Sequence, residues 1–382
     1  MKTAVDAELS RDRHWFGPGR KRILALDGGG VRGILSLAIL ERIEAELAGE
    51  AGKPVRLCDH FDLIGGTSTG AIIAAGLVLG FSAGDIRKMY EDYAPKIFRR
   101  SWWRLQGLQS KFDAGALTAQ IRDIVGERTL DSPDLQTGFA IVAKRLDTGS
   151  AWTLSNNPRA PYWEAQPGSA TIGNRHYPLA NVVRASAAAP HFFDPELLPI
   201  ATGEAHGLFV DGAVTPHNNP SLALFLLSRA RAYGVEWPTG PRNLTIISVG
   251  TGNFRARLSA ASVQRQKAIG VAFHALTGMI GDAQLQILAM MQWFGECPAP
   301  MKINSEIGTL AGEYPGGEPL FRFVRYDAEL EAEAIAALGV NLGPMDLMRL
   351  RQLDDPGILK LAYDIGQKTA ALQVKAVHFS GS

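Results

Sequence analysis

Cysteine is almost missing from this chain, whose 382 residues include only Cys58 and Cys297. Two cysteines cannot build a disulfide framework, and their separation does not match the spacing of metal ligands. We therefore expect a reducing compartment and no metal site. Charge of either sign is not in excess either, because the formal net charge is +1. A nucleic-acid binder that depends on a basic surface is not expected.

Long hydrophobic runs are also missing. The longest, residues 71–81, is far short of the roughly 20 residues that a membrane-spanning helix needs. The first twenty residues carry three arginines and no apolar stretch, so they do not have the pattern of a signal peptide. Hydrophobic residues make up 46% of the chain and charged residues 20%, as in an ordinary globular protein with a large core. We expect a cytoplasmic protein.

Glycine, by contrast, is abundant, and it marks the most informative stretch of the chain. An apolar run at 61–64 predicts the end of a buried strand, GTSTG at 66–70 predicts a sharp turn, and 71–79 predicts a helix of small residues. A strand, a tight turn and a helix are the context in which G-x-S-x-G forms a nucleophile elbow.

The two glycines of that elbow, Gly66 and Gly70, would let the strand and the helix pack closely. The turn would leave the hydroxyl of Ser68 exposed at a helix N-terminus, which favours developing negative charge. Ser68 is therefore a candidate nucleophile. A Gly- and Ser-rich loop without catalytic function would have the same local sequence.

A second glycine-rich segment, residues 28–33, follows a predicted strand at 22–26 and precedes a predicted helix. It satisfies G-x-G-x-x-G, so a dinucleotide site is one alternative. That fingerprint also needs an acidic residue that ends a second strand. Glu50 lies at the right distance, but we expect it in a turn with no strand before it. The backbone N–H groups of Gly28, Gly29 and Gly30 would equally serve as an oxyanion hole.

Strands and helices alternate through residue 252, which predicts an α/β fold with a mostly parallel central sheet flanked by helices. We expect a basic N-terminal arm at 1–21, a catalytic core at 22–255 and a mainly helical C-terminal region at 256–382 packed on that core. Further strands are predicted at 139–144, 151–154, 207–210, 243–249 and 319–326, and further helices at 83–98, 112–125, 179–189 and 220–232. One long or broken helix is predicted at 263–294, and residues 328–378 are expected to be mostly helical.

Three segments lie outside the motifs, and the first two have two interpretations each. The loop 99–109 carries Trp102 and Trp103, which would dock on the core or contact a lipid surface. The methionines of the helix 263–294 (Met279, Met290 and Met291) would fill the core or form a pliable lid for acyl chains. Residues 156–178 form the longest irregular stretch.

Four predicted strand ends are marked by glycine: DGGGVRG from residue 27, GTSTG from 66, DGA from 211 and SVGTG from 248. In their order and separation the first three resemble the patatin-like phospholipase family. The segments ASAAAP from 185 and NNP from 218 also match what surrounds the third motif in that family. The resemblance covers roughly residues 20–255 and implies a three-layer patatin-like fold.

The resemblance implies that Ser68 is a nucleophile and that Asp211, followed by Gly212 and Ala213, is its partner in a dyad. Gly28, Gly29 and Gly30 would supply oxyanion N–H groups, and Arg32 would help to hold their loop. A serine hydroxyl needs a base, and a carboxylate with a pKa of about 3.9 becomes an adequate base only in direct contact and in a desolvated site. A Ser–His–Asp triad that uses His217 or His191 is the competing arrangement.

The family resemblance implies a serine lipid acyl hydrolase that cleaves fatty acyl esters of membrane glycerophospholipids through an acyl-enzyme, without a cofactor. It would act peripherally on the inner membrane surface. Two alternatives are a catalytically silent lipid- or partner-binding protein of the same fold and, less favoured, a dinucleotide-binding oxidoreductase.

The chain is also similar in size to bacterial patatin-like effectors of antiviral signalling that cyclic nucleotides switch on. That similarity implies a cyclic nucleotide activator and a homo-oligomer, although no nucleotide-binding motif supports it. We expect such a switch in 256–382 or in the loops 99–109 and 156–178.

Overall fold

A computed structural model of the chain describes residues 9–98, 112–203, 206–255 and 268–379. The described strands, in chain order, are β1 (Lys21–Leu26), β2 (Leu63–Thr67), β3 (Gly138–Arg145), β4 (Ser150–Ser155), β5 (Glu196–Pro199), β6 (His206–Asp211), β7 (Leu244–Val249), β8 (Gly295–Glu296) and β9 (Phe321–Tyr326). The described α-helices are α1 (Ser10–Phe16), α2 (Gly33–Ala51), α3 (Leu57–His60), α4 (Thr69–Val78), α5 (Ala83–Ile97), α6 (Ala114–Val125), α7 (Leu179–Ser186), α8 (Ser221–Arg229), α10 (Ala268–Phe294), α11 (Ala332–Ala337), α12 (Asp346–Leu350) and α13 (Leu359–Gln373).

One mixed sheet organises the molecule, and six of its strands run parallel in the order β3-β2-β1-β7-β9-β8. Side chains alternate between its two faces, as the pleat of a strand requires. Leu24 and Leu26 of β1 join the larger core cluster, and Ile23 and Ala25 join the smaller one on the opposite face. The predicted α/β fold with a mostly parallel sheet is confirmed.

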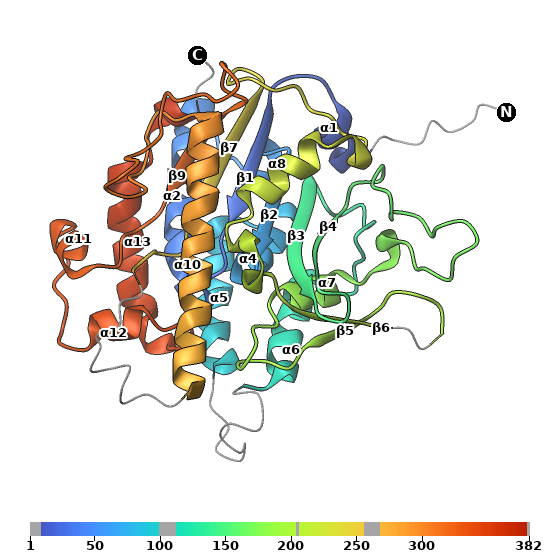
Figure 1. Ribbon diagram of the computed structural model, residues 1–382, viewed down its shortest axis with the longest axis horizontal. Coiled ribbons are helices and arrows are strands. Elements are labelled where there is room, and N and C mark those ends of the chain that lie inside the picture. The colour runs from blue at the N-terminus through green and yellow to red at the C-terminus, as the bar shows by residue number, and fades with distance from the viewer. Residues whose placement is uncertain (1–8, 99–111, 204–205, 256–267, 380–382) are drawn as a thin grey trace.

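Helices cover both faces of this sheet and make three layers. Residues of α2, α4, α6, α7 and α13 belong to the larger core cluster, and residues of α1, α8 and α10 belong to the smaller one. Figure 1 shows α8 and α10 in front of the sheet, with α2 behind it. No helix of the described residues is long and apolar enough to cross a bilayer.

The carboxyl ends of the parallel strands meet at one edge of the sheet. Leu26 is in register with Gly66 of β2 and with Val249 of β7, and Val249 is in register with Tyr326 of β9. The segments that follow these strands therefore lie next to each other, and they include the first, second and fourth glycine-marked motifs.

Strand β6 runs antiparallel to β3, a direction that the sequence did not reveal. The hairpin partner β4 occupies one edge of β3 along residues 140–145. The other edge is shared: β2 pairs with residues 138–142, and β6 pairs with residues 143–145. Strand β6 therefore meets β2 head-on, which brings its carboxyl end to the carboxyl end of β2.

Two predicted boundaries near the site need correction. The strand predicted at 61–64 is β2, which extends through Gly65 and Gly66 to Thr67. Both positions require glycine because their neighbours leave no room for a side chain. A Cβ at Gly65, for example, would lie 2.6 Å from a methyl carbon of Leu224. The turn that follows is consequently tighter than predicted, and α4 begins directly after Ser68.

The described part of the N-terminal arm predicted at 1–21 is docked on the core. Residues 10–16 form α1, and Trp15 is fully buried. The indole of Trp15 donates a hydrogen bond to Asn156 Oδ1 (3.0 Å) and lies 5.7 Å from the ring of Trp237. These contacts attach the segment to the core.

The C-terminal region, predicted as mainly helical and packed on the core, also extends the sheet: the strand predicted at 319–326 is β9, which is hydrogen-bonded to β7. The stretch 328–378, predicted to be mostly helical, is divided into α11, α12 and α13. Glycine and proline explain the division: Gly339 ends α11 with φ 71°, Pro344 precedes α12, and Pro356 precedes α13.

The predicted helix at 263–294 is continuous as α10 from residue 268, and its first five residues lie outside the described part. Its methionines differ in environment, since Met291 is fully buried and Met279 is 68% exposed. The interpretation as core filler therefore fails for Met279. The predicted loop 99–109 also lies outside the described residues.

Candidate active site

The nucleophile elbow predicted at GTSTG is present as a turn between β2 and α4. Ser68 has φ 56° and ψ −125°, a conformation that a non-glycine residue seldom adopts. A Cβ at Gly66 would lie 2.2 Å from the carbonyl of Gly70, and a Cβ at Gly70 would lie 2.2 Å from Leu26 O. Only glycine fits at either position, so the spacing of the motif is a geometric requirement of this turn.

The hydroxyl of Ser68 donates a hydrogen bond of 2.6 Å to Asp211 Oδ2. Asp211 is 2% exposed, and its second oxygen, Oδ1, accepts from the backbone N–H of Ala213 (2.8 Å). The structure thus brings together the two residues that the sequence paired, and the head-on arrangement of β2 and β6 is the reason.

Burial raises the pKa of Asp211 from 3.8 to about 6, against the opposing effects of the hydrogen bonds from Ser68 and Ala213 and of the charge of Arg184. Desolvation disfavours the ionised carboxylate and makes it a stronger base than it is in water. A group that titrates near neutral pH is suited to exchanging a proton with a serine hydroxyl.

No histidine hydrogen-bonds to Ser68 or Asp211 in the described part of the chain. His217 lies on the turn after Asp211, where burial lowers its pKa. Its backbone carbonyl accepts from Thr67 Oγ1 (2.7 Å), while its ring Nδ1 has no partner among the described residues. His191 is exposed and lies 5.5 Å from the ring of its neighbour Phe192. The geometry favours a dyad over a triad.

The glycine-rich segment after β1 lies directly against the elbow, because a Cβ at Gly28 would lie 3.0 Å from the Cβ of Ser68. However, the N–H of Gly28 donates to Asn218 O (3.2 Å). The N–H groups of Gly29 and Gly30 make no hydrogen bond with described residues. The prediction of three oxyanion donors is therefore narrowed to Gly29 and Gly30.

Several side chains fix this segment. Thr251, in the motif SVGTG that begins in β7, donates from Oγ1 to Gly28 O (2.9 Å). Thr69 Oγ1 donates to Gly30 O (3.0 Å), and the hydroxyl of Tyr90 on α5 donates to the same oxygen. Arg32, predicted to help hold the loop, is 8% exposed and stacks on Phe254, with its guanidinium carbon 5.4 Å from the ring centroid.

Two supporting residues were missed by the sequence analysis. Tyr90 lies about 60 positions from the glycine that it holds, and nothing local distinguishes it from another helical tyrosine. Ser186 lies in the segment ASAAAP, which was noted without a role for this serine. Its hydroxyl accepts from Ser68 N (2.9 Å) and donates to Val142 O (2.6 Å), so it fixes the backbone of the elbow.

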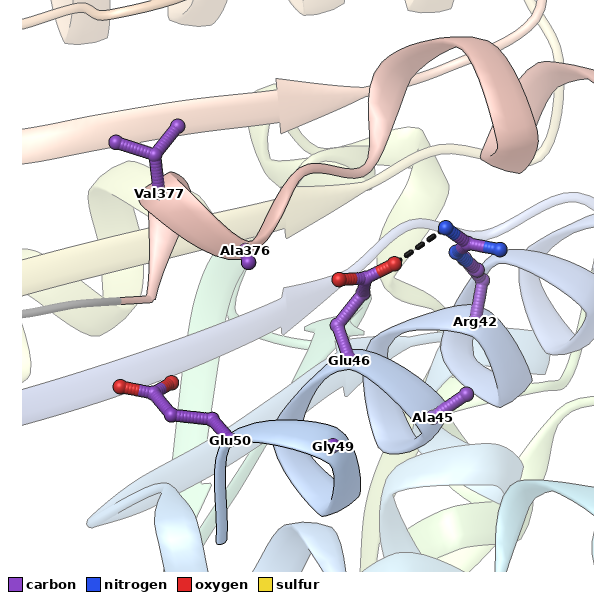
Figure 2. Close-up of a pocket in the computed structure, with 7 residues that line it drawn as sticks. All are labelled: Arg42, Ala45, Glu46, Gly49, Glu50, Ala376 and Val377. Atoms are coloured by element: carbon purple, nitrogen blue, oxygen red, sulfur yellow. Dashed lines mark ion pairs between the residues drawn. The ribbon is translucent and has the colours of Figure 1, made fainter. Parts of the chain in front are cut away.

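A groove elsewhere on the molecule does not belong to this site. It lies between the last turns of α2 and the 3-10 turn Ala376–His378, as Figure 2 shows, and is lined by Arg42, Ala45, Glu46, Gly49, Glu50, Ala376 and Val377. Gly49 is sixteen residues beyond Gly33, where α2 begins beside the glycine-rich loop, or roughly 24 Å along the helix axis. The described residues contain no group of three or more side chains that could hold a metal ion.

A comparison with family models identifies residues 24–225 as a match to the model described as patatin-like phospholipase. A cUMP-AMP-activated phospholipase of Escherichia coli is 33% identical over 233 residues, which are 60% of this chain and 64% of that protein. A cGAMP-activated phospholipase of Escherichia coli strain TW11681 is 28% identical over 256 residues, 66% of this chain and 67% of that protein. The chain thus matches less than two thirds of the length of the first of these relatives.

Two further similarities complete the comparison. The potato protein described as probable inactive patatin-3-Kuras 1 is 26% identical over 245 residues, 60% of this chain and 62% of that protein. Among solved structures, human GIVD cytosolic phospholipase A2 aligns with 98% of this chain and 63% of its own, at 11% identity and a TM-score of 0.45.

Proposed function

The chain belongs to the patatin-like phospholipase family, and from this we propose that it is a serine lipid acyl hydrolase that cleaves fatty acyl esters of membrane glycerophospholipids. The observation that carries the proposal is the 2.6 Å hydrogen bond from Ser68 Oγ to the buried carboxylate of Asp211. It joins a strained, glycine-flanked serine to a base whose pKa is raised to about 6.

The first half of the reaction would follow from this geometry. Asp211 takes the proton of Ser68 as Oγ attacks the ester carbonyl carbon, and the carbonyl oxygen becomes an oxyanion. The N–H groups of Gly29 and Gly30 would donate to that oxyanion, where preorganised donors are worth about 3–4 kcal/mol each. When the tetrahedral intermediate collapses, the C–O bond to the leaving alcohol breaks, and this alcohol takes the proton from Asp211.

The second half regenerates the enzyme. Asp211 removes a proton from a water molecule, which attacks the carbonyl carbon of the acyl-Ser68 ester. The bond to Oγ then breaks, Ser68 recovers its proton from Asp211, and the fatty acid leaves. A single residue acts as base and then as acid in each half, so it must gain and lose a proton readily near neutral pH.

The alternatives fit the structure less well. A silent protein of the same fold is conceivable, since one relative is described as probably inactive, but Ser68 and Asp211 are both present here and are hydrogen-bonded. The dinucleotide interpretation needs an acidic residue at the end of a second strand. Glu50 instead lies near the C-terminal end of α2, and Ser68 follows β2.

The test of the proposed function is hydrolysis of phospholipid vesicles by the purified protein, with released fatty acids and lysolipids identified by mass spectrometry. Wild type should release fatty acid, and Ser68→Ala should release none. Release that is equal in both proteins would refute the assignment of Ser68, and release in neither, at any condition tried, would favour the silent protein.

The proposal includes control by a ligand. Two relatives are described as cUMP-AMP-activated and cGAMP-activated phospholipases, and an enzyme acting on the inner membrane surface of its own cell needs to be restrained. A ligand shifts such an equilibrium only by its difference in affinity for the two states. We expect low basal hydrolysis that a cyclic dinucleotide raises, together with assembly of protomers. The test measures hydrolysis of phospholipid vesicles with a panel of cyclic nucleotides, and light scattering gives the molecular mass of the protein under the same conditions. A monomer with constant activity would contradict this part.

A further inference from the structure

The glycine-rich loop beside Ser68, residues 27–33, is hydrogen-bonded to a part of the chain that lies outside the matched family region 24–225. Asp27, which directly follows β1 and begins the loop, is 1% exposed. Both of its carboxylate oxygens accept from Arg325 of β9, at 2.8 Å for Oδ1 and 2.6 Å for Oδ2. A bidentate pair of this kind fixes orientation as well as charge.

Arg325 extends the contact to the neighbouring loops. It donates to Ser248 Oγ on β7 (2.7 Å) and to Asp327 Oδ2 (2.8 Å). Asp327 Oδ1 in turn accepts from the backbone N–H of Gly252 (2.8 Å), in the loop that also carries Thr251. One buried network therefore joins the loops that follow β1, β7 and β9.

Helix α10 reaches the same carboxylate from the front of the sheet. Gln284 Nε2 donates to Asp27 Oδ2 (3.2 Å). The helix also packs against the 3-10 turns Gly212–Val214 and Pro216–Asn218, which follow Asp211 and carry the backbone oxygen that binds Gly28. It thus touches both halves of the candidate site.

A backbone contact completes the support. Val31 N donates to Leu353 O (2.9 Å), in the segment after α12. Gly30 has φ 56°, and a Cβ there would lie 2.1 Å from the same carbonyl oxygen. The close approach of these two backbones explains why glycine is required at position 30.

The charge of Asp27 depends on these partners. Burial raises its pKa to about 6, while the charge and hydrogen bonds of Arg325 and the hydrogen bond of Gln284 oppose that rise. A buried carboxylate that lost a donor would take up a proton more easily, and a protonated Asp27 would no longer accept from Arg325 with both oxygens.

We propose that Arg325 and Gln284 are positioning residues for the oxyanion loop, through which the C-terminal region completes the active site. The inference rests on the proposed function and deepens it: the groups that hold Asp27 keep the N–H groups of Gly29 and Gly30 in place beside Ser68. Neither residue touches the substrate, and both act through Asp27.

The experiment compares Gln284→Leu with Gln286→Leu on the same helix. Gln286 is exposed and its side chain makes no hydrogen bond with described residues, so it is a matched control for the substitution. Hydrolysis of a soluble short-chain ester gives kcat and KM, hydrogen exchange monitors the peptide covering residues 27–33, and thermal unfolding checks stability.

We expect Gln284→Leu to lower kcat about tenfold with KM unchanged, since small misplacements of catalytic groups are costly. It should also speed exchange in residues 27–33, whereas Gln286→Leu should match wild type.

The outcomes separate the inference from the function on which it rests. If Gln284→Leu and Gln286→Leu are alike in kcat and in exchange, the positioning role is refuted even though the enzyme is active. If wild type hydrolyses no ester either with or without cyclic dinucleotides, the proposed function fails, and the exchange comparison still decides whether Gln284 holds the loop. Arg325→Lys, which keeps the charge but loses the bidentate contact, should show the same changes more strongly.

Discussion

Asp211 shows how burial can raise the pKa of a single carboxylate. Asp211 is in register with Ala143 of β3, and Thr67 is in register with the preceding residue, Val142. The carboxylate of Asp211 therefore meets the hydroxyl of Ser68 without an intervening histidine. The same burial that raises its pKa penalises the ionised carboxylate in the folded state. The contact with Ser68 and the N–H of Ala213 compensate part of that cost.

The pH dependence of the reaction should report this carboxylate. Asp211 must be ionised to accept a proton, and its pKa is about 6, so activity is present above that pH and lost as the pH falls through it. We expect kcat/KM for a soluble ester to drop about tenfold for each pH unit below 6, as for a single essential base. A profile that stays flat down to pH 4.5 would show that the carboxylate is not perturbed.

Replacing the nearest histidine separates a dyad from a triad. His217→Ala should lower kcat by less than about tenfold, equivalent to roughly 1.4 kcal/mol, because its ring has no bond to Ser68 or Asp211. The acid limb of the pH profile should also remain. A loss of several thousandfold with the fold intact, measured with the same ester, would make His217 the base.

Sequence reasoning performs well where a residue is marked by its immediate neighbours. The resemblance to the patatin-like family paired Ser68 with Asp211 through two short motifs, G-x-S-x-G and D-G-A, and the structure places Ser68 Oγ 2.6 Å from Asp211 Oδ2. Tyr90, Ser186 and Gln284 were missed because their roles come from residues 60, 118 and 257 positions away. The availability of the N–H of Gly28 could not be judged either, since its acceptor is the distant backbone oxygen of Asn218.

At the scale of elements, α5 links the surface of the molecule to the site. It begins at Ala83, as predicted, and Ser82 before it forms a capping box with Asp85. Eight residues beyond Ser82, Tyr90 donates to Gly30 O and lies 3.4 Å from Thr69 Oγ1. The same helix therefore has an N-cap that its local sequence indicates and a hydrogen bond, from Tyr90 to Gly30, that its local sequence does not indicate.

Tyr90→Phe removes that contact while keeping the ring. We expect kcat to fall several-fold and up to about tenfold, with a stability loss of about 1 kcal/mol for the missing hydrogen bond. Tyr93→Phe on the same helix is the control, because the hydroxyl of Tyr93 makes no hydrogen bond with described residues. Ester kinetics and thermal unfolding of the two variants check the prediction. Equal kcat in both would mean that Tyr90 does not support the loop.

Neither the direction of β6 nor the existence of β5 could be predicted from the sequence. Strand β5 has four residues, E-L-L-P, of which only Leu198 is fully buried. Such a segment has too few apolar residues to show a period. Strand β6 was found, but nothing in its residues distinguishes a strand that runs with β3 from one that runs against it.

On the scale of the whole molecule, the C-terminal region is part of the fold. Strand β9 carries Phe321, Phe323 and Tyr326, all at most 1% exposed, and α13 packs against α2. The family match covers residues 24–225, yet β7, β9 and α13 all lie beyond it. The boundary predicted at 255 therefore falls between two neighbouring strands of one sheet.

A chain that ends at residue 255 should consequently fail to fold. It would lose three buried aromatic side chains, roughly 5 kcal/mol or more, out of a total stability on the order of 5–15 kcal/mol. It would also expose the edge of β7, which invites aggregation. Circular dichroism should show no cooperative thermal transition, and size exclusion should show aggregates. A monomer with a sharp transition would establish 22–255 as an independent domain.

The most direct measurement of the central claim, that Ser68 is a nucleophile activated by Asp211, is the site of covalent labelling by a serine-directed fluorophosphonate. Intact mass and peptide mass spectrometry should find one phosphonyl group, on Ser68, in the wild type. Ser68→Ala should not react, and Asp211→Asn should react at least about 100-fold more slowly, because the two residues act as a unit. Labelling at another serine, or undiminished labelling in Asp211→Asn, would contradict the account.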